Sequence, residues 1–222
     1  MREVADDVWV LPSFPRDSVN AWVAGDLLID AQTRRDGKRI VKEVGGRKLS
    51  AHVLTHAHPD HQGASQHVCT TLGIPFWVGE HDVDAAEDPS LIRQRQPSHP
   101  IAQLMDRMFT GPAHPVDRAL RDGETIGDWR VIHAPGHSLG HIVLWREADR
   151  VLIVGDVLNS ANSLLPVQRG LRLPYDFFTP DPARNRESAR ALADLGEPSV
   201  ALFGHGPPVR DGRAFRQFCA AL

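Results

Sequence analysis

The chain has 222 residues, of which 41% are hydrophobic, and its formal net charge at pH 7 is −3. This composition is sufficient for a buried core, and the weakly acidic balance excludes a protein that binds nucleic acid through a strongly basic surface. No apolar run reaches the length of a membrane span, and residues 1–7 are charged where a signal peptide would begin. We expect one domain over residues 1–222, located in the cytoplasm, with no nucleic-acid or membrane partner.

The two cysteines, Cys69 and Cys219, lie far apart and outside any C-x-x-C pattern. They are expected to be free, buried thiols in a reducing compartment. The expected partner is a small-molecule substrate, and the sequence leaves open whether the chain forms a homo-oligomer.

Short apolar runs bounded by turn residues alternate with helical patterns along the first half of the chain. The predicted elements are a hairpin over 22–28, a helix over 37–44, a strand ending at Leu54, a helix over 64–72 and a strand over 76–78. Residues 89–115 are less regular and rich in proline, around a helical pattern over 101–108. That helix is either a connector packed on the core or a lid beside a functional site.

The second half repeats the strand pattern at 129–132, 151–154 and 200–203. A second irregular stretch, 158–180, contains the only tyrosine, Tyr175. Asp181, Pro182 and Gly196 then bracket a helix, because they are typical of a cap, a first turn and a stop.

One six-residue segment, His56-Ala57-His58-Pro59-Asp60-His61, contains four potential metal ligands directly after an apolar run. In an extended segment, His56 and His58 point to the same side, and Pro59 sets the turn that brings Asp60 and His61 after them. Imidazole nitrogen and carboxylate oxygen together suit zinc, iron or manganese.

Three later strands each end in a residue of the same kind. His137 follows the strand at 129–132, Asp156 follows 151–154, and His205 follows 200–203. Functional groups concentrate on loops at one edge of such a sheet, and the neighbouring glycines allow tight turns there. The sequence therefore predicts five histidines and two aspartates around one point.

This arrangement resembles the metallo-β-lactamase fold superfamily of hydrolases, in its glyoxalase II-like branch. The matching motifs are His56-x-His58-x-Asp60-His61, Pro135-Gly136-His137-Ser138, Gly155-Asp156 and Gly204-His205-Gly206, and Asp30 is similar to the family's early acidic position. The resemblance implies a four-layer αββα sandwich with a two-metal centre. It implies that His56, His58 and His137 hold one metal, that Asp60, His61 and His205 hold the other, and that Asp156 bridges them. We expect two divalent ions, Zn²⁺ before Fe or Mn.

The chemistry implied is hydrolysis. Two close cations stabilise hydroxide near neutral pH, and a metal-bridged hydroxide would attack a carbonyl or phosphoryl centre. Asp60 is the expected catalytic residue, because it would orient the hydroxide and then carry a proton. We predict a hydrolase of a small ester, thioester or lactone.

Each of these residues also has an ordinary interpretation: Asp60 could cap a helix, and Asp156 could belong to a turn. The joint pattern of seven residues in the family order favours the metal site. The histidines without such a pattern are interpreted as surface or packing residues: His52, His67, His81, His99, His114 and His133. His141 is interpreted as a strand-start residue, with support of a metal ligand as the alternative.

Asp156 also bears on the substrate. An aspartate at the bridging position resembles thioesterases, lactonases and phosphodiesterases, whereas β-lactamases typically carry Cys or Ser there. Glyoxalase II adds a C-terminal helical domain for glutathione, and we expect none here, since the chain ends 17 residues after His205. Tyr175 is a candidate to hold a substrate carbonyl, as in lactonases, although packing of this aromatic is the favoured interpretation.

Other classes stay open. A persulfide dioxygenase of this fold would use one iron held by two histidines and the bridging aspartate, which this ligand set permits. Phosphodiesterase or β-lactamase-type activity is a further alternative. A non-catalytic protein of the fold is disfavoured, because such members usually lose ligands and this chain keeps all seven.

Overall fold

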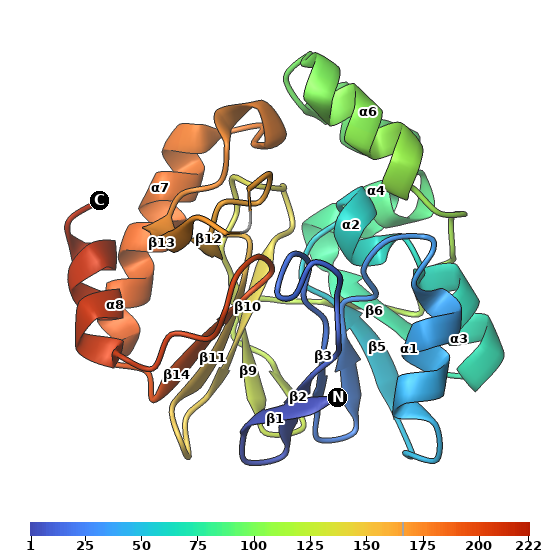
Figure 1. Cartoon of the computed structure of the whole chain (residues 1–222), viewed down its shortest axis with the longest axis horizontal. Helices are drawn as coiled ribbons and strands as arrows, with labels where there is room; N and C mark the ends of the chain where they lie inside the picture. Colours follow the sequence, from blue (N-terminus) through green and yellow to red (C-terminus); the bar gives the residue numbers. More distant parts are fainter. Residues whose placement is uncertain (166) are drawn as a thin grey trace.

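Two mixed β-sheets form the centre of the computed structural model, which describes residues 1–165 and 167–222 (Figure 1). The seven-stranded sheet runs in sequence order: β1 (Arg2–Ala5), β2 (Val8–Val10), β3 (Trp22–Ala24), β4 (Leu27–Ile29), β5 (Ala51–Leu54), β6 (Phe76–Gly79) and β7 (Arg118–Leu120). The five-stranded sheet has the order β14-β11-β10-β9-β8, with β8 (Thr125–Ile126), β9 (Trp129–His133), β10 (Ile142–Arg146), β11 (Val151–Gly155) and β14 (Val200–Phe203). A small separate sheet pairs β12 (Asn159–Ala161) with β13 (Arg169–Arg172).

Strand direction places several strand ends at one edge. Strands β4 to β7 are parallel, so the loop after β5 leaves from the same edge as those after β4 and β6. In the second sheet, β9 and β11 are both antiparallel to β10, and β14 is parallel to β11. The C-terminal ends of β9, β11 and β14 therefore share an edge, as predicted from the sequence.

The main hydrophobic core lies between the two sheets. It combines Trp22 and Val53 from the first sheet with Leu144, Ile153 and Leu202 from the second, all fully or almost fully buried. Because successive side chains of a strand alternate between its faces, the opposite faces are also apolar and need helices to cover them.

Helices supply the two outer layers. Helices α1 (Gly37–Val44) and α3 (Ser65–Leu72) cover the seven-stranded sheet, and α7 (Pro182–Ala191) and α8 (Gly212–Ala220) cover the five-stranded sheet (Figure 1). The shorter helices are α2 (Pro59–Gln62), α4 (Val83–Glu87) and α5 (Ser90–Arg95), together with the single turns η1 (Glu80–Asp82), η2 (Asp176–Phe178) and η3 (Leu192–Leu195). This is the expected four-layer αββα sandwich of the metallo-β-lactamase fold.

Local signals explain the helix boundaries. The carboxylate of Asp181 accepts a hydrogen bond from the amide of Arg184, and Pro182 occupies the first turn of α7, as predicted. After η3, Gly196 has a φ of +84° and ends the segment. The C-terminal helix α8 begins in the same way at Asp211, and its Phe215 and Cys219 lie one turn apart on the buried face.

Residues 89–115 are more regular than predicted, because they contain α5 as well as α6 (Pro100–Phe109). The cysteines are free and buried, as predicted. Within the described part of the chain, no helix is long and apolar enough to cross a membrane.

Candidate metal centre

The loop after β5 carries four of the seven predicted ligands. The chain leaves β5 at Leu54 and enters α2 at Pro59, whose ring fixes φ in the helical range and so starts the helix directly after His58. This turn brings three rings together: the ring centroid of His56 lies 4.6 Å from that of His58 and 4.2 Å from that of His61. His56 and His61 have no exposed surface.

The other three predicted ligands come from the loops after β9, β11 and β14. These are His137, Asp156 and His205, and all three are buried. Glycine is required beside them, because a Cβ atom at Gly204 would lie 1.9 Å from Oδ1 of Asp156. The absence of a side chain at this one position leaves room for the aspartate.

The seven residues form three overlapping groups. Within each group, the ligand atoms all lie within 4.8 Å of one another. The groups are His56, His58 and His137; His56, His61 and Asp156; and Asp60, His61 and His205. The first and third are the two metal sites that the resemblance implied. Asp156 lies between them, since its carboxylate oxygens are 3.7 Å from Nε2 of His61, 3.7 Å from Nε2 of His137 and 3.1 Å from Nε2 of His205.

Nitrogen atoms at the centre lack protein partners. Among the described residues, Nε2 of His56, His61 and His137 is buried without a hydrogen bond, while Nδ1 of each ring is held from behind. Burying an unpaired polar atom is costly, and a cation at the centre would remove that cost. Nitrogen and carboxylate donors in this number suit two divalent cations of the zinc, iron or manganese type.

The two halves of the centre differ in charge. Burial and the neighbouring rings hold the pKa of His56 and of His137 well below its ordinary value, and burial lowers that of His58 to about 4. These rings are therefore neutral near pH 7, which is the form that binds a metal.

The opposite half is a cluster of charged pairs in the absence of a metal. Burial lowers the pKa of His61, but the carboxylates of Asp60, Asp156 and Asp30 outweigh it and raise the value to about 9. Burial raises the pKa of Asp60 and Asp156, but the adjacent His61 and His205 hold both well below the ordinary range. A cation bound here would take the place of protons.

The early acidic residue, Asp30, lies behind the centre. Its Oδ2 is 2.9 Å from Nδ1 of His61, and its carboxylate also accepts hydrogen bonds from the amide and hydroxyl of Thr55. The hydroxyl of Thr55 in turn contacts Nδ1 of His56 at 3.0 Å. One buried carboxylate thus orients rings in both halves of the centre.

Sequence reasoning missed several supporting residues. Asp82 is buried and accepts hydrogen bonds from the amide of Ala57, the hydroxyl of Ser138 and the amide of Gly140. It thereby ties the His56–His61 loop to the loop that carries His137. In the sequence, Asp82 looks like any acidic residue near a helix start, so only its long-range contacts reveal it.

His141 contacts two of the proposed metal ligands, Asp156 and His56. A residue that only starts a strand would not be expected to do so. Its Nε2 accepts a hydrogen bond of 3.0 Å from the amide of Asp156, and its ring stacks on His56 with centroids 4.7 Å apart. It does precede β10, but the alternative, support of the ligands, describes these contacts better. Its position four residues after His137 was the available signal.

Two of the remaining histidines, His52 and His81, have the packing and surface positions that were expected. His52 is buried, contacts the carbonyl of Leu28 and the hydroxyl of Ser65, and stacks on Phe76. His81, by contrast, is exposed.

Tyr175 contacts Asn162 and Phe177. Its hydroxyl pairs with the side-chain amide of Asn162, its ring stacks on Phe177, and it is absent from the described residues that line the cavity. These contacts agree with the packing interpretation, and the role of Tyr175 at a substrate carbonyl stays a prediction.

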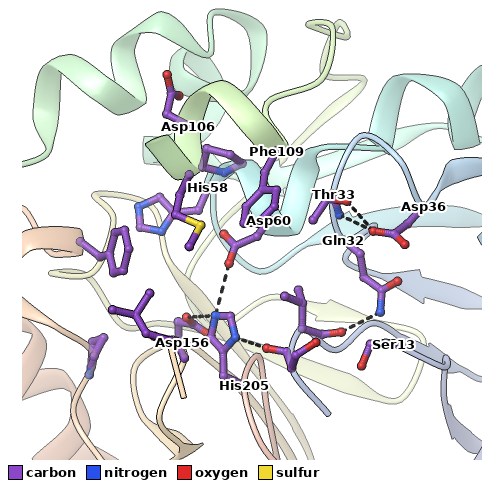
Figure 2. A pocket seen from close by; sticks show the side chains of 18 of the residues that line it. Ser13, Gln32, Thr33, Asp36, His58, Asp60, Asp106, Phe109, Asp156 and His205 are labelled. Carbon is purple, nitrogen blue, oxygen red and sulfur yellow. Dashed lines mark hydrogen bonds and ion pairs between the residues drawn. The ribbon is translucent and has the colours of Figure 1, made fainter. Parts of the chain in front are cut away.

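A cavity of about 420 Å³ opens above the ligand cluster. Figure 2 shows His58, Asp60, Asp156 and His205 converging on one side of it, with Phe109 of α6 above Asp60. Ala102, Met105 and Phe109 of α6 form part of its wall, while Leu104 of the same helix is 54% exposed. The helix therefore lines the cavity, as the lid interpretation predicted, and is not a connector buried in the core.

Comparisons with known proteins agree with this geometry. A sequence model of the metallo-beta-lactamase superfamily matches residues 15–205. The chain belongs to this superfamily. A probable metallo-hydrolase of Bacillus subtilis, YflN, is 34% identical, covering 93% of this chain and 81% of its own length. The relatives that it resembles in this superfamily include proteins described as probable metallo-hydrolases.

Solved structures of the superfamily also superpose on the chain. The metallo-beta-lactamase family protein TTHA1429 of Thermus thermophilus has a TM-score of 0.70 and 25% identity, covering 99% of this chain and 80% of that one. The BLEG-1 B3 metallo-beta-lactamase has a TM-score of 0.67 and 27% identity, covering 91% and 93%. The fold typically binds divalent metals, in agreement with the ligand groups described above.

Proposed function

We propose that the protein is a dinuclear zinc hydrolase that cleaves a small ester or thioester, with a lactone as a related substrate. The observation that carries the proposal is the set of three buried Nε2 atoms, of His56, His61 and His137, that have no hydrogen bond among the described residues and lie close to the carboxylate of Asp156. His56, His58 and His137 would hold one cation, and Asp60, His61 and His205 the other, with Asp156 between them. The bound cations would supply Lewis acidity, polarising the substrate carbonyl and lowering the pKa of water.

Asp60 would move the proton in this proposal. Its Oδ2 lies 3.3 Å from Nε2 of His205, and 23% of its side chain is exposed toward the cavity, compared with 5% for Asp156. Because its pKa is held well below the ordinary range, it is ionised at neutral pH. A carboxylate in this state accepts a proton from the attacking water and returns it to the leaving group.

The cavity wall supports an acyl substrate. Met105 and Phe109 from α6 and Leu164 and Phe178 from the other side present apolar surface above the ligands. An acyl chain of moderate size would lie against these residues while its carbonyl reaches the metal centre.

Relatives support a thioester more specifically. The hydroxyacylglutathione hydrolase GloC of Haemophilus influenzae is 29% identical over 55% of this chain, and the acyl-coenzyme A thioesterase MBLAC2 of Gallus gallus is 29% identical over 68% of it. Both names describe thioester hydrolysis. Asp156 at the bridging position agrees with the resemblance to the glyoxalase II-like branch, on which the proposal also draws.

The first test is the metal content of the purified protein, measured by elemental mass spectrometry. Two zinc ions per chain agree with the proposal. One iron per chain, with oxygen uptake in the presence of a persulfide, would replace it with the dioxygenase alternative. No metal after reconstitution would overturn the metal centre itself.

The second test is the variant Asp60→Asn, assayed with a panel of thioesters, esters and lactones. General-base catalysis contributes about 10²- to 10⁴-fold, so turnover should fall within that range. Metal content is measured on the same sample, because Asp60 is also a proposed ligand. Asp194→Asn, an exposed substitution in η3, is the matched control. Full turnover in Asp60→Asn with both metals bound would contradict the role of Asp60.

A further inference from the structure

Three arginines gather around one carboxylate, Asp17, in the loop between β2 and β3. Oxygens of Asp17 lie 3.5 Å from Nη2 of Arg2, 3.8 Å from Nε of Arg16 and 3.7 Å from Nη1 of Arg169. The arginines come from β1, from the loop after β2 and from β13, so three separate parts of the chain converge here. The Asp17 side chain is only 9% exposed, whereas those of the arginines are 44%, 73% and 47% exposed.

The charges in this cluster do not balance. One carboxylate faces three guanidinium groups, which leaves a local excess of two positive charges on a chain whose overall charge is −3. Solvent-exposed ion pairs each contribute about 0–1 kcal/mol, so stabilisation of the fold does not account for gathering three like charges. Guanidinium groups held together and open to solvent are a favourable binding site for phosphate or carboxylate oxygens.

The cluster adjoins the proposed metal centre through the backbone. The carbonyl of Asp17 accepts a 2.8 Å hydrogen bond from the amide of Gly206, and the carbonyl of the next residue, Ser18, is bonded to Nδ1 of His205. Pro15 and Ser18 line the cavity. The Asp17 segment, which holds the three arginines, therefore adjoins His205, and its neighbours Pro15 and Ser18 reach the cavity.

The neighbouring wall, which is bonded to the same loop through Gln32 and the carbonyl of Val19, carries one arginine that is paired. Arg39 lines the cavity there, but its guanidinium is bonded to the carboxylate of Asp36, to the side chain of Gln32 and to the carbonyl of Pro12. Figure 2 shows Gln32, Thr33 and Asp36 together on this wall, and the side-chain amide of Gln32 donates a hydrogen bond to the carbonyl of Val19 in the loop that carries Asp17. Arg35 also lines the cavity, so the positive charge near it comes from Arg35 as well as from the three arginines at Asp17.

We propose that Arg2, Arg16 and Arg169 bind an anionic group, phosphate or carboxylate, on the leaving-group half of the substrate. This inference rests on the proposed hydrolase function. The acyl half lies against the apolar wall of α6 and the scissile carbonyl lies at the ligand cluster, so the remaining half of the substrate leaves the cavity beside His205. Asp17 keeps the three guanidinium groups in place without cancelling their charge.

The test compares substrates that differ by one charged group. An acyl thioester of 4′-phosphopantetheine is paired with that of pantetheine, and one of N-acetylcysteine with that of N-acetylcysteamine. The first pair tests phosphate and the second carboxylate. The measured quantity is the ratio of kcat/KM for the charged substrate to that for its neutral partner, in the wild type and in the double variant Arg16→Ala, Arg169→Ala.

The ratio for at least one pair should fall about tenfold or more in the double variant, because charge-assisted hydrogen bonds to two arginines are lost. The ratio should also fall in the wild type as salt is raised. Arg186→Ala, an exposed arginine on α7, is the matched control and should leave the ratio unchanged. An unchanged ratio in the double variant for both pairs would overturn the proposal. So would a fall confined to Arg35→Ala, since Arg35 lines the cavity itself and lies outside the Asp17 cluster.

A readout without turnover separates this proposal from the hydrolase proposal. Binding of inorganic phosphate to the metal-loaded protein is followed by calorimetry in the wild type and in the double variant. Any phosphate that binds at the metals should bind equally to both proteins. A second phosphate-binding event that is present in the wild type and lost in the double variant therefore supports the arginine subsite, even if no thioester is cleaved. Identical isotherms contradict the subsite whatever the outcome of the activity assays.

Discussion

The carboxylate of Asp30 lies 2.9 Å from Nδ1 of His61, and neither side chain has any exposed surface. The two residues are 31 positions apart, and the contact leaves Nε2 of His61 directed at the ligand cluster. Partners of this kind fix the orientation of a metal-binding ring and increase its basicity. We therefore expect the contact between Asp30 and His61 to increase the affinity of the His61 site for a metal ion.

Asp30→Asn should weaken cation binding at the His61 site by about 10- to 100-fold. The substitution keeps the size of the side chain but replaces one carboxylate oxygen with an NH₂ group. An NH₂ group cannot accept a hydrogen bond, so the bonds from His61 and Thr55 can no longer all form. Affinity is measured by titration against a chromophoric chelator. Asp26→Asn, in the exposed turn between β3 and β4, is the control. Equal affinity in Asp30→Asn and the wild type would show that Asp30 does not orient the ring.

Asp82→Asn should destabilise the protein by about 1–3 kcal/mol, because a buried amide NH₂ group would face at least one of three hydrogen-bond donors. Burial raises the pKa of Asp82, and the bonds from Ser138, Ala57 and Gly140 oppose that effect. The free energy of unfolding is measured by denaturant titration of the metal-free protein. The control is Asp84→Asn, whose carboxylate is 57% exposed and pairs with Arg95. If the two variants are equally stable, the link between the loops has no energetic role.

Gly204→Ala should reduce metal content, because its new methyl group would lie 1.9 Å from Oδ1 of Asp156 and 2.7 Å from Cε1 of His61. The aspartate must move away from its position between the two ligand groups, and we expect a loss of affinity of at least about tenfold. Gly123→Ala is the control, since a Cβ there meets nothing within 4 Å although its φ is +78°. Two metals per chain at unchanged affinity in Gly204→Ala would contradict the proposed bridging position.

His52 should make stability depend on pH between about 4 and 6.5. Burial lowers its pKa from 6.5 to about 4, against the opposing effect of its bond to the carbonyl of Leu28. The unfolded chain therefore binds a proton in this range that the folded chain does not. The contribution of His52 to the free energy of unfolding is fully present above pH 6.5. It is lost as the pH falls toward 4, by up to about 3 kcal/mol.

The variant His52→Gln isolates this contribution. The slope of the unfolding free energy against pH should become shallower by up to about 1.4 kcal/mol per pH unit relative to the wild type. The ligand histidines also titrate, but they are common to both proteins and cancel in the difference. His81→Gln, at a side chain that is 62% exposed, is the matched control. Parallel slopes for His52→Gln and the wild type would contradict the assignment.

Much of the fold and of the ligand set could be predicted from the sequence, because both depend on local patterns. The helix predicted over 37–44 has those bounds in the structure, and the apolar runs at 129–132, 151–154 and 200–203 all lie in strands. Ligand-type residues directly after parallel strands meet at one edge whatever the details of packing. For the same reason His56, His137 and His205 could be expected to lie together.

The tertiary structure alone decided which residues support and surround that centre. Thr179 lies behind His137 across 42 positions, Asp82 joins two loops, and Arg2 meets Arg169 at Asp17. It also decided that α6 lines the cavity and that Tyr175 turns to Asn162. Periodicity and turn residues specify where strands and helices begin and end. The partner of a single side chain depends on the paths of loops that are distant in the sequence, and those paths are set only when the two sheets pack.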